Sequence, residues 1–181
     1  MNTLNTLFRA ASITTLIFVL SACSNMEPLQ VVDDVDLGRF MGDWYVIANI
    51  PTSIEKGAHN AIESYRLDED GSIATTFTFH DNGFDGELKT YEPRGFVSDE
   101  SNAIWGMQFI WPIKADYRII HLDDAYSVTV IGRNKRDYVW IMAREPVLPE
   151  SDYMEILAML ESVGYDPVKI LKVPQKWQQR G

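Results

Sequence analysis

The chain has 181 residues, of which 46% are hydrophobic and 12% aromatic, so it has room for one domain with a sizeable core. Its formal net charge of -10 disfavours nucleic acid as a partner and makes binding to anionic lipid through a general basic patch unfavourable. The charge indicates solubility and points to no particular partner.

Residues 1–22 have the features of a signal peptide. They contain one basic residue, Arg9, no acidic residue, and an apolar run at 13–20 that is too short to cross a bilayer comfortably. The run leads into Leu-Ser-Ala-Cys at 20–23, which is similar to the bacterial lipobox, where the cysteine is lipidated and becomes the mature N-terminus. Cys23 is the only cysteine, so an intrachain disulfide is excluded. We therefore expect lipidation at Cys23; the alternative is an ordinary buried cysteine.

The segment after the cysteine is predicted to tether the protein to a membrane. Several acyl chains at ~0.8 kcal/mol per buried methylene give stable anchoring, whereas a single chain is marginal. Ser24, a residue other than aspartate, resembles the outer-membrane sorting signal of such lipoproteins. Residues 23–35 contain Pro28, scattered acids and no sustained periodicity, which is typical of a tether. The expected location is the outer membrane, lipid-anchored, with the domain facing the periplasm.

The folded domain is predicted to cover residues 36–175, beginning with a short helical turn. Gly42 then stands two positions before Trp44 at the mouth of a strand, where a glycine lets backbone approach the large indole of a buried plug. If Trp44 faces inward, the two-residue period of a strand sends Val46 and Ala48 inward with it. Small and branched side chains on this face leave space.

Eight strands are predicted, separated by turn residues. They cover 43–50, 60–68, 72–80, 87–97, 102–111, 116–122, 126–132 and 137–144. Consecutive hairpins favour an all-β fold, an eight-stranded antiparallel up-and-down β-barrel, because closure removes exposed strand edges. The connection at 51–60 could be an entrance flap or a plain loop.

The hydrophobic period changes after the last strand. Pro149 and Ser151 mark a helix start, apolar residues recur at helical spacing, and Gly164 marks the stop. This predicts one C-terminal α-helix packed outside the barrel. A short strand at 168–173 and a polar tail at 176–181 complete the chain.

The inward face of the barrel decides whether it is filled or holds a ligand. An apolar, aromatic and methionine-containing lining suits a lipid cavity, although large aromatic residues also pack solid cores. Glu63 faces the cavity if Tyr65 does; a shift of one residue in the register would leave it in solvent. The candidate ligand-binding residues are Val46, Ala48, Glu63, Tyr65, Thr75, Phe77, Phe79, Met107, Phe109, Tyr138 and Trp140.

Four features together resemble the lipocalin family, and within it the bacterial lipoproteins of the Blc type and their apolipoprotein D-like relatives. They are the Gly-Asp-Trp-Tyr motif at 42–45, the pair Asp116-Tyr117, the run at 136–144 and the helix after Pro149. The resemblance implies that Trp44 packs beneath Arg144 at the closed end of the barrel. Ala115 stands where the second family motif usually has threonine.

The resemblance also implies a function. Lipocalins bind and carry small hydrophobic ligands, and fatty acids or lysophospholipids are the expected class here, with no cofactor and no enzymatic activity. Burying ~12 methylenes at ~0.8 kcal/mol gives about 10 kcal/mol. Association costs ~4 kcal/mol or more, so we expect micromolar affinity. The family includes dimers, so a homodimer is an open expectation, and no nucleic-acid partner is expected.

Competing functions have less support in the sequence. It contains no Gly-x-Ser-x-Gly, no His-Glu-x-x-His and no phosphate loop. His59, His80 and His121 lie on separate segments, so no metal site is predicted, although a single histidine could be an axial haem ligand. A structural lipoprotein with a filled barrel is the third alternative.

Overall fold

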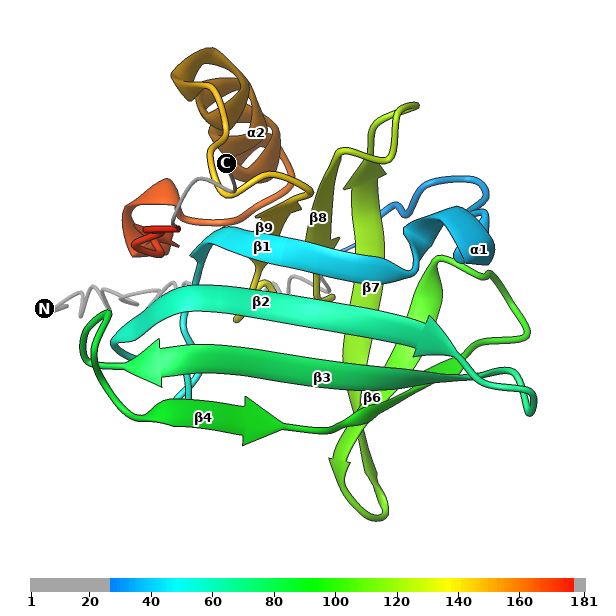
Figure 1. Ribbon diagram of the computed structural model, residues 1–181. Coiled ribbons are helices and arrows are strands. Elements are labelled where there is room, and N and C mark those ends of the chain that lie inside the picture. Colours follow the sequence, from blue (N-terminus) through cyan, green and yellow to red (C-terminus); the bar gives the residue numbers. More distant parts are fainter. Residues whose placement is uncertain (1–26, 178–181) are drawn as a thin grey trace, which may run out of the picture.

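The structure is a computed structural model that describes residues 27–177 (Figure 1). The expected signal peptide, the lipidation site at Cys23 and the last residues of the predicted polar tail lie outside the described residues. No helix within 27–177 is long and apolar enough to span a bilayer.

The described chain forms a closed antiparallel barrel with one long helix outside it (Figure 1). Strand β1 pairs with both β2 and β9, which closes the sheet into the eight-position barrel predicted from the sequence. The elements are α1 (Leu37–Phe40), β1 (Gly42–Asn49), β2 (Ala58–Leu67), β3 (Ser72–Asp81), β4 (Leu88–Tyr91), β5 (Arg94–Val97), β6 (Ile104–Ile110), β7 (Ile113–Leu122), β8 (Val128–Gly132), β9 (Trp140–Ala143), α2 (Glu150–Ser162), η1 (Pro167–Lys169) and β10 (Leu171–Lys172).

Strands β4 and β5 share the fourth position of the barrel, and both pair with β3. The predicted single strand at 87–97 is interrupted between them at Glu92-Pro93, because proline has no backbone N–H to donate to a ladder. The Pro93 carbonyl still accepts a hydrogen bond from the Thr75 N–H of β3 (3.2 Å), so the barrel wall continues across the break.

The hairpin between β6 and β7 is longer than predicted. The sequence favours an end at Pro112 and a new strand at 116, but β7 already begins at Ile113, which pairs with Ile110. The hairpin therefore turns tightly over Pro112 and projects from the body of the barrel (Figure 1).

The predicted tether is shorter than expected, because the chain packs on the barrel from Leu29 onward. Leu29 and Val35 are buried. The Val32 N–H donates to the Ile119 carbonyl (3.0 Å), and the Leu29 N–H donates to Asn134 Oδ1 (2.8 Å). This segment lacks the alternating pattern of a strand, so the sequence shows no sign of its packing.

The C-terminal segment fills a gap between β1 and β2. The register of β2 against β3 shifts between His59 and Ile62, and β10 pairs with the far end of β1. Gln175 Nε2 then donates to the Val46 carbonyl (2.8 Å), and the ring of Trp177 lies 5.3 Å from that of Tyr45. The start of the predicted polar tail is therefore docked on the barrel.

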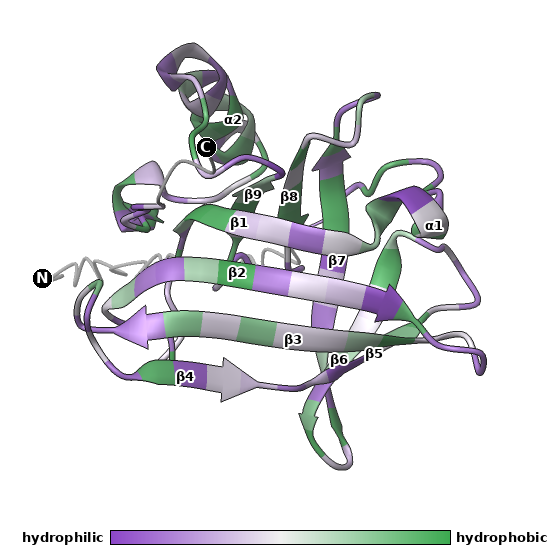
Figure 2. Cartoon of the chain, in the orientation of Figure 1, coloured by the Kyte–Doolittle hydropathy of each residue, from purple (hydrophilic) through white to green (hydrophobic). Residues whose placement is uncertain are grey.

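The buried residues form two hydrophobic cores. Figure 2 shows hydrophobic positions along the barrel strands and along α2. The inner core extends inside the barrel from Phe40 and Trp44 at the closed end to Phe79 nearer the open end. The outer core lies between the barrel wall and the buried face of α2, which carries Tyr153, Ile156 and Leu160. Both cores consist of residues between Leu29 and Val173, so residues 27–181, called the body below, contain a complete core and are expected to fold as a unit.

The prediction that Ala48 faces the cavity is wrong, because Ala48 belongs to the outer core. Val46 pairs with Met142 on the inner side, and a register shift then makes Ala48 pair with Ile141 of the outer core. A bulge adds one residue to one strand and so reverses the alternation beyond it. Ala48 therefore does not face the barrel interior as predicted.

Candidate functional site

The closed end of the barrel is plugged by Trp44. Its indole is fully buried, donates from Nε1 to the Phe40 carbonyl (2.9 Å) and packs on the Phe40 ring at 5.1 Å. The guanidinium carbon of Arg144 lies 3.8 Å from the centroid of the Trp44 ring. Gly42 has φ of +94°, and a side chain there would meet Arg144 Nη1 at 3.4 Å, which explains the glycine.

Arg144 also fastens the chain that enters the barrel. Its Nη2 donates to the carbonyls of Arg39, Phe40 and Met41 at 2.9–3.0 Å, and its Nη1 donates to the Asp43 carbonyl at 2.7 Å. The carbonyls of Arg39 and Phe40 belong to the last turn of α1 and that of Met41 to its C-cap, where no helical partner is available. One side chain thus joins the end of β9 to α1 and β1.

The second motif contributes to the barrel wall. Tyr117 stacks on Trp105 with ring centroids 4.9 Å apart, and its hydroxyl lies 2.7 Å from that of Tyr65. Burial raises the pKa of both tyrosines well above the ordinary value. Asp116 accepts from Arg118 Nε (2.9 Å) and from the Asn134 N–H (2.7 Å), which holds β7 to the β8–β9 connection.

A cavity of about 240 Å³ lies between this closed end and the open end of the barrel. Five predicted ligand-binding residues line it: Glu63, Phe77, Met107, Phe109 and Trp140. Its other lining residues are Thr52, Ser53, Ile54, Glu55, Ala115, Asp116, Tyr117 and Arg133. The barrel is therefore packed solid in its closed half and hollow toward its mouth.

The other candidate residues lie around the cavity without lining it. Val46, Tyr65 and Phe79 belong to the inner core, and Thr75 is buried with its hydroxyl directed at Met107 Sδ (3.9 Å). Tyr138 is half-buried in the β8–β9 connection, its ring 6.3 Å from that of Trp140. The strand predicted at 137–144 begins only at Trp140, so the alternation used to orient Tyr138 does not apply there.

Glu63 faces inward. It pairs with Trp44 on one neighbouring strand and with Phe77 on the other, and both of these side chains are inside the barrel. Burial raises its pKa from 4.5 to about 7, and the charge of Glu55 adds to the shift against a hydrogen bond from Tyr65. The sequence left two registers open for Glu63, inward or in solvent, and the structure has the inward one.

Glu55 is a buried carboxylate that our sequence analysis missed. It is 6% exposed and accepts hydrogen bonds from Asn49 Nδ2 (3.0 Å), the Thr52 N–H (3.2 Å) and Trp140 Nε1 (3.2 Å). Burial raises its pKa, while these hydrogen bonds oppose the shift. Thr-Ser-Ile-Glu at 52–55 has the spacing of a capping box, the signal that could have predicted a turn with its glutamate folded back. Glu55 thus ties the β1–β2 loop to β9 at the mouth.

Arg133, also missed, is the one cationic side chain among the residues that line the cavity. Its Nη1 lies 3.5 Å from Asp137 Oδ2, and its guanidinium lies 5.3 Å from the Tyr138 ring centroid. Its Nε is buried and makes no hydrogen bond to the described residues. A buried donor without a partner is unfavourable, so Arg133 would gain a hydrogen bond by turning toward a ligand head group.

The described residues contain no cluster of three or more histidine, cysteine, aspartate or glutamate side chains that could hold a metal ion. His59 and His80 lie near backbone carbonyls of Gly57 and Gly86, and neither they nor His121 line the cavity. The described lining therefore has no histidine ligand for a haem.

Replacing Glu63 by glutamine should stabilise the body at high pH. The raised pKa means that ionisation of Glu63 costs the folded state stability as pH rises from about 4.5 to about 7, and the full cost applies above that window. We expect Glu63→Gln to raise the free energy of unfolding by about 2–3 kcal/mol at pH 8 and to change it little at pH 4. Urea unfolding at both pH values measures this, with the exposed Glu161→Gln as control; equal effects at both pH values would contradict a titrating Glu63.

Comparison with known proteins shows which family has this architecture. Residues 35–175 match the family of the lipocalin-like domain. The outer membrane lipoprotein Blc of Escherichia coli K12 is 30% identical over 168 residues, covering 89% of this chain and 93% of that protein. Rat apolipoprotein D is 32% identical over 164 residues, covering 84% of this chain and 82% of that protein.

Solved structures share the fold at lower identity. Lobster apocrustacyanin A1 superposes with a TM-score of 0.63 at 14% identity, covering 78% of this chain and 81% of its own. Insecticyanin from the tobacco hornworm Manduca sexta gives 0.62 at 16% identity, covering 83% of this chain and 85% of its own. Family match, relatives and barrel agree, and the chain belongs to the lipocalin family.

Proposed function

We propose that this lipocalin binds a small hydrophobic ligand, a fatty acid or lysophospholipid, and stores or transports it for maintenance of the bacterial envelope. The observation that carries the proposal is the open-mouthed cavity lined by Phe77, Met107, Phe109 and Trp140 above a closed end plugged by Trp44. Apolar walls with few polar groups are typical of sites for such ligands. The arrangement supports a binding protein rather than an enzyme, and no cofactor is proposed.

The proposed cellular location follows from the N-terminal sequence and from the names of the relatives. Signal-peptide features at 1–22 and the lipobox-like end support lipidation of Cys23. Several matched relatives are named outer membrane lipoprotein Blc. We therefore propose an anchor in the outer membrane with the body in the periplasm.

The cavity volume limits how much of a ligand is enclosed. A volume of 240 Å³ equals about eight water volumes at ~30 Å³ each, and a methylene group is of similar size. About eight methylenes contribute ~6 kcal/mol, less than the ~12 methylenes assumed from the sequence. The rest of a longer chain would lie at the mouth, against the half-exposed Phe109.

The charges of the lining orient the ligand. Glu63 lies toward the closed end, beside Trp44 on the neighbouring strand, and would repel a fatty-acid carboxylate when ionised. Arg133 follows β8 at the open end and offers an unused N–H. An anionic head group therefore belongs at the mouth, with the chain directed inward.

Glu63 also favours a second candidate ligand. A hydroxyl or amine carried at the inner end of an apolar molecule could hydrogen-bond to its carboxyl group. This ligand would lie in the opposite direction and would need no contact with Arg133.

Titration of the body with single-chain lipids tests these proposals through tryptophan fluorescence, to which Trp140 in the cavity lining contributes. We expect saturable one-to-one binding of dodecanoic acid with a micromolar Kd. Arg133→Gln should weaken dodecanoic acid about 10-fold, the loss of one charge-assisted hydrogen bond, and leave 1-dodecanol unchanged. Absence of saturable binding by any single-chain lipid would refute the function, whereas an unchanged affinity in Arg133→Gln would refute only the orientation.

A further inference from the structure

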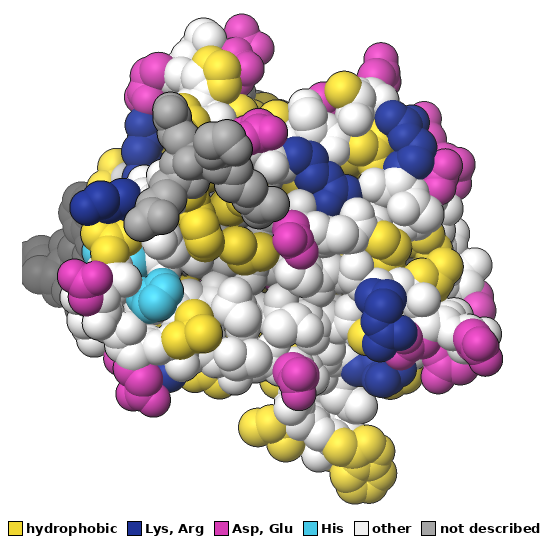
Figure 3. Space-filling view, in the orientation of Figure 1, with side chains coloured by type: hydrophobic (Ala, Val, Ile, Leu, Met, Phe, Trp, Pro, Cys, Tyr) yellow, Lys and Arg dark blue, Asp and Glu magenta, His cyan; other side chains and the backbone are white. Residues whose placement is uncertain are grey.

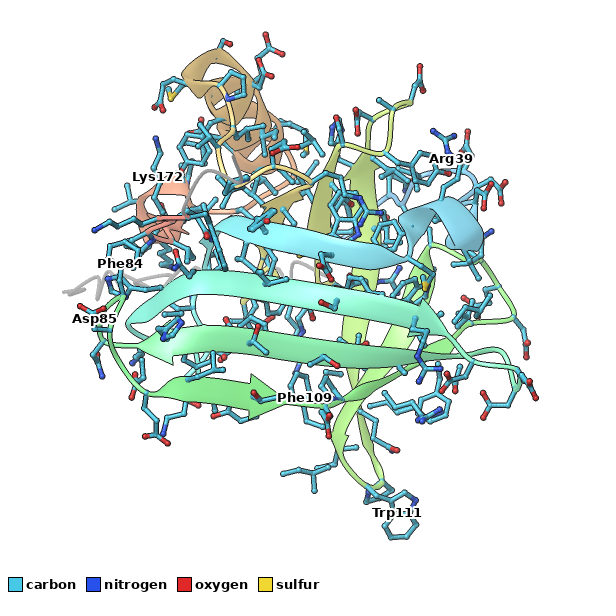
Figure 4. The ribbon with its side chains drawn as sticks, in the orientation of Figure 1. Arg39, Phe84, Asp85, Phe109, Trp111 and Lys172 are labelled. Carbon is cyan, nitrogen blue, oxygen red and sulfur yellow. The ribbon has the colours of Figure 1, made fainter. Side chains whose placement is uncertain are left out.

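The turn of the β6–β7 hairpin exposes large apolar side chains. Residues 109–113, called the hairpin tip below, include Phe109, Ile110, Trp111 and Ile113, with exposed fractions of 48%, 72%, 82% and 69%. Figure 3 shows hydrophobic side chains at the end of a projection from the body, and Figure 4 places Trp111 at its extremity. The four side chains present on the order of 500 Å² of apolar surface, at the upper end for a patch on a monomer.

The hairpin tip makes no contribution to either core. None of its four large side chains belongs to the inner or the outer cluster of buried residues or to the partly buried shell packed on them. Exposed tryptophan and isoleucine on a tight turn are unfavourable in water, so their presence points to a partner.

The charge around the hairpin tip is unlike that of the rest of the chain. The chain has 26 acidic residues, yet 102–115 contain none. The one charged residue in this stretch is Lys114, whose ammonium group lies 3.7 Å from the ring centroid of Phe96. A hairpin without acidic residues can approach a phospholipid head-group layer at little electrostatic cost.

We propose that the hairpin tip inserts into the surface of a phospholipid bilayer. Tryptophan suits this position because its apolar body enters the acyl boundary while its N–H stays at the head groups. A second copy of the chain fits less well, since a stable dimer needs about 800 Å² on each partner and the tip is narrow and convex. The expected lipid anchor would hold the body near such a surface.

Because the hairpin tip adjoins the cavity, its insertion into a bilayer would affect how a ligand enters. Phe109 belongs both to the tip and to the lining of the cavity, so the inserted tip would present the cavity mouth to the bilayer. A single-chain lipid could then pass along Phe109 without crossing open water. The docking itself does not depend on what the cavity binds, so it can be tested independently of the proposed function.

The test measures binding of the body to phosphatidylcholine vesicles by cosedimentation. The double variant Ile110→Ser/Trp111→Ser should lose at least about 10-fold in partition coefficient, with an unchanged Tm because both side chains are exposed. The matched control Val147→Ser/Val168→Ser removes two side chains that are 76% and 86% exposed elsewhere on the body, and it should bind as the parent does. Vesicles with 30% phosphatidylglycerol should bind more weakly, since the chain is acidic.

Insertion also has a spectroscopic signature. Brominated acyl chains should quench part of the tryptophan fluorescence, and Trp111→Phe, compared with the parent at an equal bound fraction, should lose that quenched part. Failure of the parent body to bind vesicles, or equal loss in the tip and control variants, would overturn the proposal. A dimer in sedimentation velocity that the tip variant abolishes would also overturn it, by assigning the tip to a second copy of the chain.

Discussion

Replacing Arg144 by alanine should lower the free energy of unfolding of the body by about 3 kcal/mol and its Tm by roughly 10 °C. The variant loses the cation–π contact with Trp44, worth ~2 kcal/mol when desolvated. It also leaves the carbonyls of Phe40 and Met41 without the donor that Arg144 supplies. Thermal unfolding followed by near-UV circular dichroism measures the loss, and tryptophan fluorescence reports the exposure of Trp44.

Arg144→Lys is the matched control for this result. Lysine keeps the charge over the indole but lacks the planar fork that reaches several carbonyls at once, so it should recover about half of the lost stability. An Arg144→Ala body with unchanged Tm and unchanged fluorescence would show that the closed end is held by packing around Trp44 alone.

Replacing Ala115 by phenylalanine should reduce the affinity for a single-chain lipid by about 30-fold or more. Ala115 lines the cavity opposite Met107 on the neighbouring strand, so the added ring occupies space that a ligand chain needs. Losing even three enclosed methylenes at ~0.8 kcal/mol removes about 2 kcal/mol of binding. The open cavity accepts the ring, so stability should change by about 1 kcal/mol or less.

Ala125→Phe is the control for the cavity-filling variant. Ala125 is exposed in the β7–β8 turn at the closed end, where an added ring meets neither the cavity nor the hairpin tip. Lipid titration of both variants by isothermal calorimetry separates the two positions. Equal affinity of the Ala115→Phe body and the parent would mean that the ligand binds elsewhere.

The fold was predictable because alternation along strands is a local property of the sequence. The run at 75–79 alternates threonine with phenylalanine, and the structure places Phe77 and Phe79 inside as the pattern indicates. The turn chemistry between strands likewise fixed their number and order. The closure of the barrel was inferred from the consecutive hairpins, because closure removes exposed strand edges. The pairing of Trp44 with Arg144, 100 positions later, came from the family resemblance, since local patterns carry no information on such distant contacts.

Irregular features of the backbone were not predictable in the same way. The bulge that turns Ala48 outward leaves no mark in a continuous apolar run, because both faces of β1 are buried there. The packing of residues 29–35 depends on single hydrogen bonds to distant loops rather than on a repeated pattern. The two-residue period of a strand therefore predicts side-chain orientation within strands but not at bulges or in unpaired segments.

Among the polar groups of the cavity, too, residues within strands were predictable and residues in connections were not. The sequence left Glu63 either inward, on the face of Tyr65, or in solvent after a shift of one residue, and the structure has the inward register. Glu55 and Arg133 lie in connections outside the strands, so no period orients them. Their positions follow from hydrogen bonds and packing at the mouth, which only the three-dimensional structure reveals.

Native mass spectrometry of the body purified from a bacterial host, combined with lipid extraction, tests whether the cavity carries a single-chain lipid. We expect a bound fatty acid or lysophospholipid, retained on purification or added from a lipid panel, at one per chain or one per dimer. The Ala115→Phe body should carry none under the same conditions. A parent body that stays empty against the whole panel would contradict the carrier function and favour a structural lipoprotein.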